Sequence, residues 1–150
     1  MQFNQAPFNI ENFLPYLLNR AAEEASDTFQ TIYKTRYGML LHEWRVLFHL
    51  GYYDRLTASQ ICQIGGLHKT KVSRALRALE DKKFITRTTQ DADRRFATVE
   101  LTSRGKLVYD ELCQEAANFH ERLMADFSTA EKTLLIDCLR RLKGRSFLGA

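Results

Sequence analysis

Residues 66–104 constrain the fold of this chain more than any other segment. They begin as a basic helical pattern and continue into two short runs of β-forming residues joined by a charged connection. In the helical part, Val72, Ala75, Leu76 and Leu79 recur at the spacing that lines one face of an α-helix. This apolar face predicts a helix that packs on a core and turns its other face to solvent.

The solvent-facing side of this predicted helix combines short hydroxyls with long cations. Such a mixture suits contacts with both the phosphates and the base edges of a DNA groove. A charged outer face is also common on amphipathic surface helices of every kind, so the helix by itself leaves both interpretations open. His68 stands at its start, either as a weak N-cap or as a base contact. The candidate DNA-contacting residues of this helix are His68, Lys69, Thr70, Lys71, Ser73, Arg74 and Arg77.

A shorter helix is predicted immediately upstream. Thr57 is a suitable N-cap for a segment in which Ala58, Ile61 and Cys62 would face inward, and two consecutive glycines then end it. A short helix, a glycine turn and a second helix make up a helix-turn-helix. In that motif the second helix enters the major groove and the first lies across the DNA backbone. The candidate contacts of the supporting helix are Thr57, Ser59 and Gln60.

The segment ends in a predicted β-hairpin. Residues 84–88 and 96–101 are rich in β-branched and aromatic side chains, and the second run alternates between two faces. The connection between them is polar and too long for a tight turn, so it should project as a wing. Arg94 and Arg95 at its tip are expected to reach a second groove of the DNA, the minor groove. Asp93 has the wrong sign for a phosphate contact and is expected to orient one of these arginines.

Several spaced motifs in this order resemble the MarR (multiple antibiotic resistance regulator) family of winged helix-turn-helix transcription factors. They are the run from Leu67 to Leu76, the Asp93-x-Arg95 pair shortly before Leu-Thr-x-x-Gly at 101–105, and Glu43-Trp44-Arg45-Val46-Leu47 in an earlier helix. The resemblance extends over residues 10–143. It implies a mainly α fold with a small antiparallel β-hairpin wing, and a DNA-binding transcriptional regulator.

Positive charge is concentrated where this resemblance places the DNA. Residues 68–95 hold nine Lys or Arg and four Asp or Glu, a net charge of +5, whereas the whole chain carries +4. A phosphate-binding surface needs such local charge. The 150 residues, 45% of them hydrophobic, suffice for one domain. No apolar run of about eighteen residues and no export-type start is evident, so a cytoplasmic location without membrane association is expected.

Long helical patterns with wide apolar faces flank this central segment. The N-terminal pattern tolerates Pro15 only in its first turn or at a kink, and the last pattern starts with a capping box of Ser128 and Glu131. The central segment is too small to cover these faces, so we expect a homodimer interlocked across a two-fold axis, with a monomeric bundle as the alternative. The family resemblance implies the same dimer. The chain would then be a single MarR-type domain over 1–150, with dimerisation helices at 9–37 and 103–145 and a winged helix-turn-helix at 40–102.

Little else in the chain suggests chemistry. Cys62, Cys113 and Cys138 lie far apart without the spacing of metal ligands, so no metal site is expected, and their apolar surroundings predict buried thiols. Some members of the family sense peroxides through a cysteine, which leaves a thiol redox switch as an alternative. No nucleophile with its base, carboxylate pair or phosphate-binding glycine loop is evident. We therefore expect a protein that is not an enzyme and has no cofactor.

The family resemblance also implies a small-molecule effector. Members generally bind small, often aromatic and anionic molecules in a cleft between the dimerisation helices and the winged domain. By this analogy the chain is a repressor on a pseudo-palindromic operator in double-stranded DNA, released by such a ligand; a ligand-independent architectural protein is the alternative. The candidate pocket residues are Tyr16, Arg20, Trp44, Arg45 and His49. Packing of the junction and surface ion pairs would explain the same residues equally well.

Overall fold

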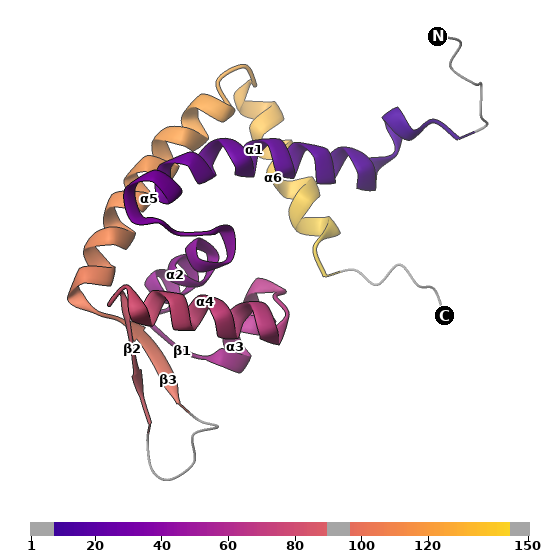
Figure 1. The fold of residues 1–150 in the computed structure, drawn as a ribbon. Coiled ribbons are helices and arrows are strands. Elements are labelled where there is room, and N and C mark those ends of the chain that lie inside the picture. Colours follow the sequence, from indigo (N-terminus) through magenta and orange to yellow (C-terminus); the bar gives the residue numbers. More distant parts are fainter. Residues whose placement is uncertain (1–7, 90–96, 145–150) are drawn as a thin grey trace, which may run out of the picture. The chain divides into compact units, whose positions relative to one another are not determined.

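The computed structural model of the chain describes residues 8–89 and 97–144 (Figure 1). The chain divides into two units, residues 1–114 and 115–150, and one long helix contributes to both. In chain order the elements are η1 (Ile10–Asn12), α1 (Leu14–Tyr37), α2 (Leu41–Tyr53), β1 (Arg55–Thr57), α3 (Ala58–Gly65), α4 (Lys69–Asp81), β2 (Ile85–Thr88), β3 (Thr98–Leu101), α5 (Ser103–Leu123) and α6 (Thr129–Leu142). This mainly helical architecture with a small antiparallel sheet confirms the predicted fold class.

The helix boundaries follow from local capping chemistry. Pro15 lies in the first turn of α1, one of the two positions that the sequence allows it, where its missing N–H leaves no hydrogen bond unmade. At the predicted cap of α3, the Thr57 Oγ1 accepts the Gln60 N–H at 3.2 Å and the Gln60 Oε1 accepts the Thr57 N–H at 2.8 Å. Leu40 offers α2 no side-chain acceptor, and the Glu43 carboxylate accepts the Leu40 N–H at 3.3 Å. Side chain–backbone bonds thus set where α2 and α3 begin.

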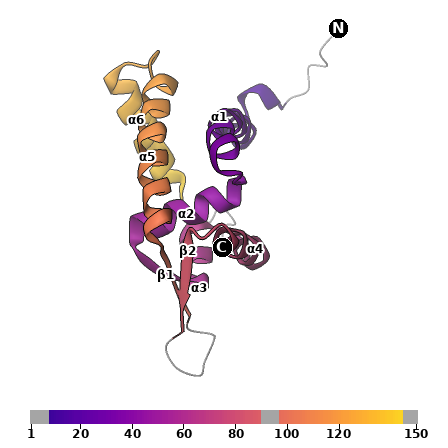
Figure 2. The same cartoon turned by 60° about the vertical axis from the view of Figure 1, so that its left-hand side comes forward.

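Three short antiparallel strands form one sheet in the order β1-β3-β2. β2 and β3 are the arms of the predicted hairpin, with Ile85 opposite Leu101, and they run side by side in Figure 1. Figure 2 shows the same hairpin turned by 60°. The sequence does not predict the third strand, β1, which is three residues long and pairs Arg55 with Glu100. A strand this short carries no alternating pattern of its own, and only its distant partner defines it.

One apolar core joins α2, α3, α4 and the sheet. The predicted inner face of α4 is buried: Val72, Ala75, Leu76 and Leu79 are each at most 3% exposed. In α3, Ile61 is buried as predicted, but Ala58 is exposed, so its predicted inward position is wrong. The cause is the shortness of α3, whose first residue lies at the edge of the core. Other fully buried side chains of this core include Val46, Leu47, Leu50 and Val99.

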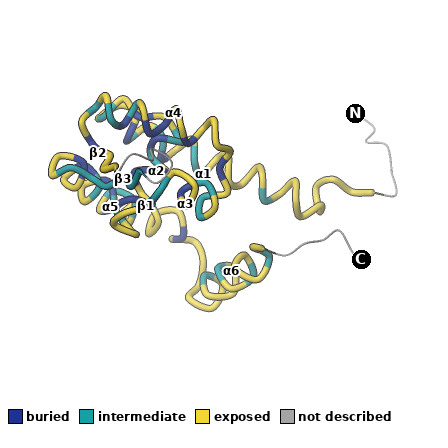
Figure 3. The backbone as a smooth tube through the Cα atoms, turned by 90° about the horizontal axis from the view of Figure 1, so that it is seen from below, coloured by how far each residue is buried: buried dark blue, intermediate teal, exposed yellow. Residues whose placement is uncertain are grey.

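The second unit consists of the end of α5 and the whole of α6. The predicted capping box starts α6: the Glu131 N–H donates to the Ser128 Oγ at 3.2 Å, and the Ser128 N–H donates to the Glu131 carboxylate at 2.7 Å. These bonds lower the pKa of Glu131. No residue of α6 is buried, and Figure 3 shows this helix without dark blue. Its apolar stripe stays open, with Leu134, Leu135 and Leu139 at 60%, 40% and 41% exposure.

The three cysteines are half-buried, which corrects the prediction of buried thiols. Cys138 lies on α6, whose apolar stripe has no cover in a single chain, and its sulfur lies 3.4 Å from a guanidinium nitrogen of Arg141. Cys113 lies on α5, and its side chain forms a hydrogen bond with Tyr109, whose pKa burial and this bond raise to about 12. Apolar neighbours in sequence therefore indicate a helix face but do not establish that it is covered.

Two negative findings apply to residues 8–89 and 97–144. None of the helices in this part of the chain is both long and apolar enough to cross a lipid bilayer. Its His, Cys, Asp and Glu side chains also form no group of three or more that is suited to a metal ion.

Candidate DNA-binding surface

The outer face of α4 is open along its whole N-terminal half. The inner face packs on α2 and α3, and this packing fixes which side chains remain outside. An α-helix with cations and hydroxyls on its open face has the dimensions and donors to enter a DNA major groove. The predicted contact residues are all exposed there: His68, Lys69, Thr70, Lys71, Ser73, Arg74 and Arg77.

His68 is the N-cap of α4. Its Nδ1 accepts the Thr70 N–H at 3.3 Å, which is the first of the two roles that the sequence leaves open. The turn before it depends on Gly66, whose φ of 59° lies in the left-handed region that glycine adopts without a steric penalty. This glycine sets the direction in which the chain leaves α3, and His68 then starts α4.

The three candidate residues of the supporting helix lie together in the first turn of α3. Thr57 and Gln60 use their side chains on the backbone of that turn, in the capping box described above. Ser59 is exposed and lines the same groove as Lys69 and Ser73 of α4. The structure thus brings the first turns of both helices to one surface.

Arg87 joins this surface, although the sequence pattern does not single it out. It lies in β2, and its Nε–H donates to the Glu80 carboxylate of α4 at 3.2 Å. Ile85, two residues earlier, is buried, and alternation along a strand turns Arg87 to the same side of the sheet. That spacing is the signal that could have identified it. The predicted wing residues Asp93, Arg94 and Arg95 lie outside the described residues.

The base of the wing is fastened to the end of α4. The Thr102 Oγ1 donates to the Lys83 carbonyl at 2.7 Å and accepts the Gly105 N–H at 3.0 Å. A Cβ at Gly105 would lie 1.9 Å from the Phe84 carbonyl oxygen, so this close approach of two backbones requires glycine. The strands of the wing are therefore held at a set distance from α4.

Glu43 ties α2 to the same C-terminal end of α4. It is the one buried charged residue in the described part of the chain, at 7% exposure. Its carboxylate accepts the Leu40 N–H and lies 3.4 Å from the Lys82 Nζ. Lys82 is the C-cap of α4, where a cation also interacts favourably with the helix dipole. An ion pair largely shielded from water thus anchors the C-terminal end of α4.

Trp44 and His49, two candidate pocket residues, belong to a chain of aromatic contacts between α1 and α2. The Trp44 ring stacks on Tyr33 at a centroid distance of 5.7 Å and contacts Phe29 at 5.5 Å. Phe48 contacts both Trp44 and His49. The Tyr33 hydroxyl is buried without a hydrogen-bond partner among the described residues, and burial raises its pKa. These ring contacts hold α1 and α2 together.

Arg45, a third pocket candidate, is exposed on α2. Burial lowers the pKa of the neighbouring His42, and the charges of Lys71 and Arg45 lower it further. These shifts favour the neutral form of the His42 side chain. The positive charge at the start of α4 thus continues onto α2 through Arg45, without a contribution from His42.

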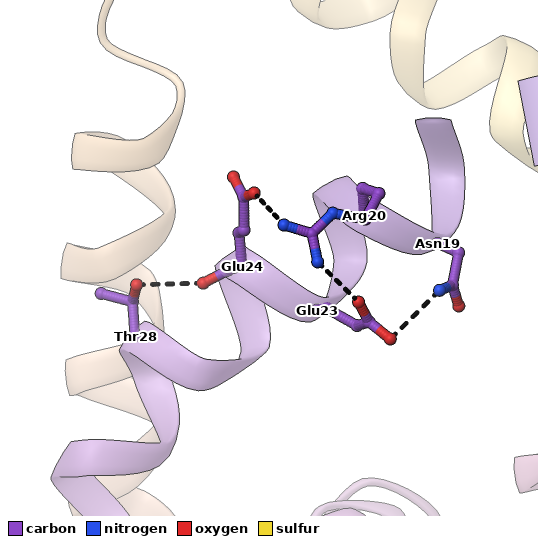
Figure 4. Close-up of polar contacts among 5 residues, drawn as sticks. All are labelled: Asn19, Arg20, Glu23, Glu24 and Thr28. Atoms are coloured by element: carbon purple, nitrogen blue, oxygen red, sulfur yellow. Dashed lines mark hydrogen bonds and ion pairs between the residues drawn. The ribbon is translucent and has the colours of Figure 1, made fainter. Parts of the chain in front are cut away.

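The last two pocket candidates, Tyr16 and Arg20, lie in the first half of α1. Figure 4 shows Arg20 paired with two carboxylates of its own helix, at 3.3 Å from Glu23 and 3.0 Å from Glu24. At a rise of about 1.5 Å per residue, Tyr16 lies roughly 20 Å along the helix axis from Phe29, which contacts Trp44. The five candidates therefore do not converge on one pocket within a single chain.

Comparison with known proteins matches the central segment to one family. The profile of the MarR family matches residues 37–95. Over 125 residues the chain is 25% identical to the uncharacterized HTH-type transcriptional regulator YwaE of Bacillus subtilis (strain 168), a match that covers 83% of this chain and 73% of that protein.

Solved structures resemble the chain along most of its length. A MarR/EmrR family transcriptional regulator from Acinetobacter sp. ADP1 has a TM-score of 0.81 and 29% identity, over 90% of this chain and 95% of that one. Bordetella bronchiseptica BpsR, studied for the regulation of its DNA binding by 6-hydroxynicotinic acid, has a TM-score of 0.83 over 94% of this chain and 100% of that one. At 19% identity the likeness to BpsR shows the fold alone.

Proposed function

Because the chain belongs to the MarR family of winged helix-turn-helix transcriptional regulators, we propose that it is a homodimeric repressor of a pseudo-palindromic operator, released by a small effector. DNA-binding regulators of transcription are not a class of enzyme. The observation that carries the proposal is α4: the four apolar residues of its inner face are buried, while every predicted contact on its outer face is exposed. Such a helix beside a wing suits the major groove of DNA.

The proposed homodimer rests on apolar side chains that a single chain leaves open. A second copy related by a two-fold axis would cover them and would present two copies of α4 about 34–36 Å apart, one turn of B-DNA. We propose that residues 9–37 and 103–145 form this dimer interface and that residues 40–102 form the DNA-binding part. Exposed apolar residues of the proposed interface are Leu14, Leu17, Leu134, Leu135 and Leu139.

The proposed effector is a small aromatic or anionic molecule. The aromatic side chains around Trp44 offer stacking surfaces, and Arg45 offers a charge for a carboxylate or phenolate. Tyr16 and Arg20 would complete such a site only from the partner chain, because they are too far along α1 in their own. An effector would also have to compete with Glu23 and Glu24 for Arg20.

The proposed release mechanism is a shift between two populations of dimer. In one population the two α4 helices have the spacing of the operator, and in the other they do not. An effector that binds the second population more tightly lowers operator affinity, and the factor cannot exceed the ratio of its affinities for the two populations. The regulator would act where the chromosomal DNA is, and we propose a cytoplasmic location for that reason.

Selection of binding sites from a random DNA pool with the purified full chain tests the proposal. We expect an inverted repeat to be enriched, and light scattering after gel filtration should find two chains on each recovered duplex. Retention of DNA in the presence of every aromatic acid tried would favour the ligand-independent architectural alternative. Release by peroxide that is lost in a Cys→Ser variant would favour the redox alternative. Recovery of no consensus at low salt would overturn sequence-specific binding.

A further inference from the structure

A groove of about 500 Å³ runs between α3, α4 and β2. Its floor includes Val72 and Leu76, whose side chains also belong to the core. Its rim carries two cations and two hydroxyls, contributed by Lys69, Arg87, Ser59 and Ser73. These four side chains come from three different elements and supply only groups that can donate to an anion.

Arg87 is held over this groove. Its Nε–H bonds to Glu80, and a guanidinium carries four further N–H donors on its two Nη atoms. The Arg87 side chain is 36% exposed, so an anion can reach it, while the bond to Glu80 restricts its motion. A cation fixed in this way loses little conformational entropy when it binds an anion.

The position of the groove indicates which anion it meets. On one side lies the open face of α4, which the proposed function places in the major groove of DNA. On the other side lies the β2–β3 hairpin, which it places in the adjacent minor groove. The ridge between a major and a minor groove of B-DNA is a phosphodiester backbone, and it has to cross the protein between these two elements.

We propose that this groove binds the sugar-phosphate backbone of one DNA strand, with Arg87 as a phosphate contact that joins the recognition helix to the wing. Lys69 provides the second cation, and the hydroxyls of Ser59 and Ser73 donate to phosphate oxygens. Lys69 and Ser73 then position the protein on DNA, and base reading falls to residues farther round α4, such as Arg74. This inference rests on the proposed function and adds Arg87 to its contacts.

The test is the salt dependence of DNA binding by the full chain. The probes are a fluorescent duplex selected by the wild-type protein and a scrambled duplex of equal length, each titrated over a range of NaCl concentrations. Arg87→Gln removes one phosphate contact per protomer, so the slope of log affinity against log salt should fall by about 0.9 per protomer. Affinity should fall by the same factor for both duplexes, and Arg87→Lys should restore the slope. Lys69→Gln should behave as Arg87→Gln does.

A matched control is Arg55→Gln. Arg55 is also a strand arginine in an ion pair, 2.7 Å from Glu100, but it lies outside the groove and should leave the slope unchanged. Ethylation interference locates the contact: one ethylated backbone phosphate per half-site should weaken wild-type binding and have no effect on Arg87→Gln.

Three results would overturn the inference while leaving the proposed function intact. The first is a salt slope in Arg87→Gln equal to that of the wild type, and the second is a loss of affinity that depends on one base position of the selected duplex. The third is displacement of DNA from the wild type by benzoate, if Arg87→Gln abolishes this displacement and keeps the wild-type salt slope. The last result would indicate a small-anion site in the groove. Failure of the wild-type chain to bind either duplex would instead contradict the proposed function itself.

Discussion

α4 and α6 are amphipathic helices of similar length, but they differ in how much of their apolar stripe is buried. α4 has 13 residues and α6 has 14, and each carries an apolar stripe and begins at a side-chain N-cap. α4 buries four residues of its stripe against other elements of its own chain, chiefly α2, whereas α6 buries none. An amphipathic pattern therefore indicates which face of a helix will be covered but not by what. For α4 the cover is the chain's own core, and for α6 we propose a second copy of the chain.

The largest effect is expected when charged residues are introduced into the apolar stripe of α6. Leu135→Asp with Leu139→Asp should raise the dissociation constant of the dimer at least about a thousand-fold, about 4 kcal/mol, because two carboxylates would be desolvated in an apolar interface. Sedimentation velocity over a range of protein concentrations measures this change. Thr133→Asp with Arg140→Asp adds the same side chains to the opposite side of α6 and should leave the dimer intact. Equal dimerisation of both variants would mean that α6 needs no partner.

The matched change in α4 removes apolar volume from its covered face. Leu79→Ala should lower the free energy of unfolding by about 3 kcal/mol, since Leu79 is fully buried and the surrounding core closes only in part around the cavity. Urea denaturation at two protein concentrations measures it. The loss at Leu79 should be the same at both concentrations, whereas the loss in a Leu134→Ala variant should grow on dilution if the α6 stripe lies in a dimer interface. A concentration-dependent loss at Leu79 would contradict the assignment of its cover to the same chain.

Local signals predicted the elements well because they need only neighbouring residues. The inner face of α4 follows from a period of 3.6 residues, and the starts of α3 and α6 follow from side chains that bond within one turn. The contact residues of α4 could be predicted as exposed for the same reason: a buried face determines the open one.

Features that depend on distant pairing were missed. β1 exists only because Arg55 and Glu100 meet across 45 positions of sequence, and no local pattern in three residues signals that pairing. The sequence around Arg87 indicates only a strand, and its contact with Glu80 depends on the folded structure. The exposure of Ala58 and of the three cysteines depends on how far the core extends, which a periodic pattern does not contain.

The anchor of α4 on α2 offers a smaller and more specific test of the covered region. Glu43→Gln keeps an acceptor for the Leu40 N–H but removes the charge that faces Lys82, and it should cost about 1–2 kcal/mol of unfolding free energy. Lys82→Met removes the other partner. A double-mutant cycle by urea denaturation should give a coupling energy between Glu43 and Lys82 well above the error. Additive losses of unfolding free energy would show that the two side chains do not interact. Lys132→Met on α6 removes the same charge and serves as the control, which should show no coupling to Glu43.

The smallest expected effect concerns the contact of Tyr37 and Arg36 of α1 with Glu111 of α5. Burial and the hydrogen bond to Glu111 raise the pKa of Tyr37 from its ordinary value of 10.0 to about 12. The neutral phenol is therefore favoured in the folded state, and the stabilisation is complete below pH 10.0 and lost as pH rises toward 12. The bonds from Tyr37 and Arg36 lower the pKa of Glu111, so its contribution is present above the ordinary value of 4.5 and lost as pH falls below it.

Tyr37→Phe should accordingly destabilise the chain by a constant amount at neutral pH, and the difference from the wild type should shrink at both extremes. Urea denaturation across the pH range measures this difference. The effect should be smaller than at Leu79 or Glu43, because the Glu111 carboxylate is exposed and pairs of this kind contribute little. Tyr52→Phe, an exposed tyrosine of α2, controls for the loss of a phenol and should show no such profile. A Tyr37→Phe difference that stays constant above pH 10.0 would mean that Tyr37 packs on Phe84 but that its hydroxyl does not hold α1 to α5.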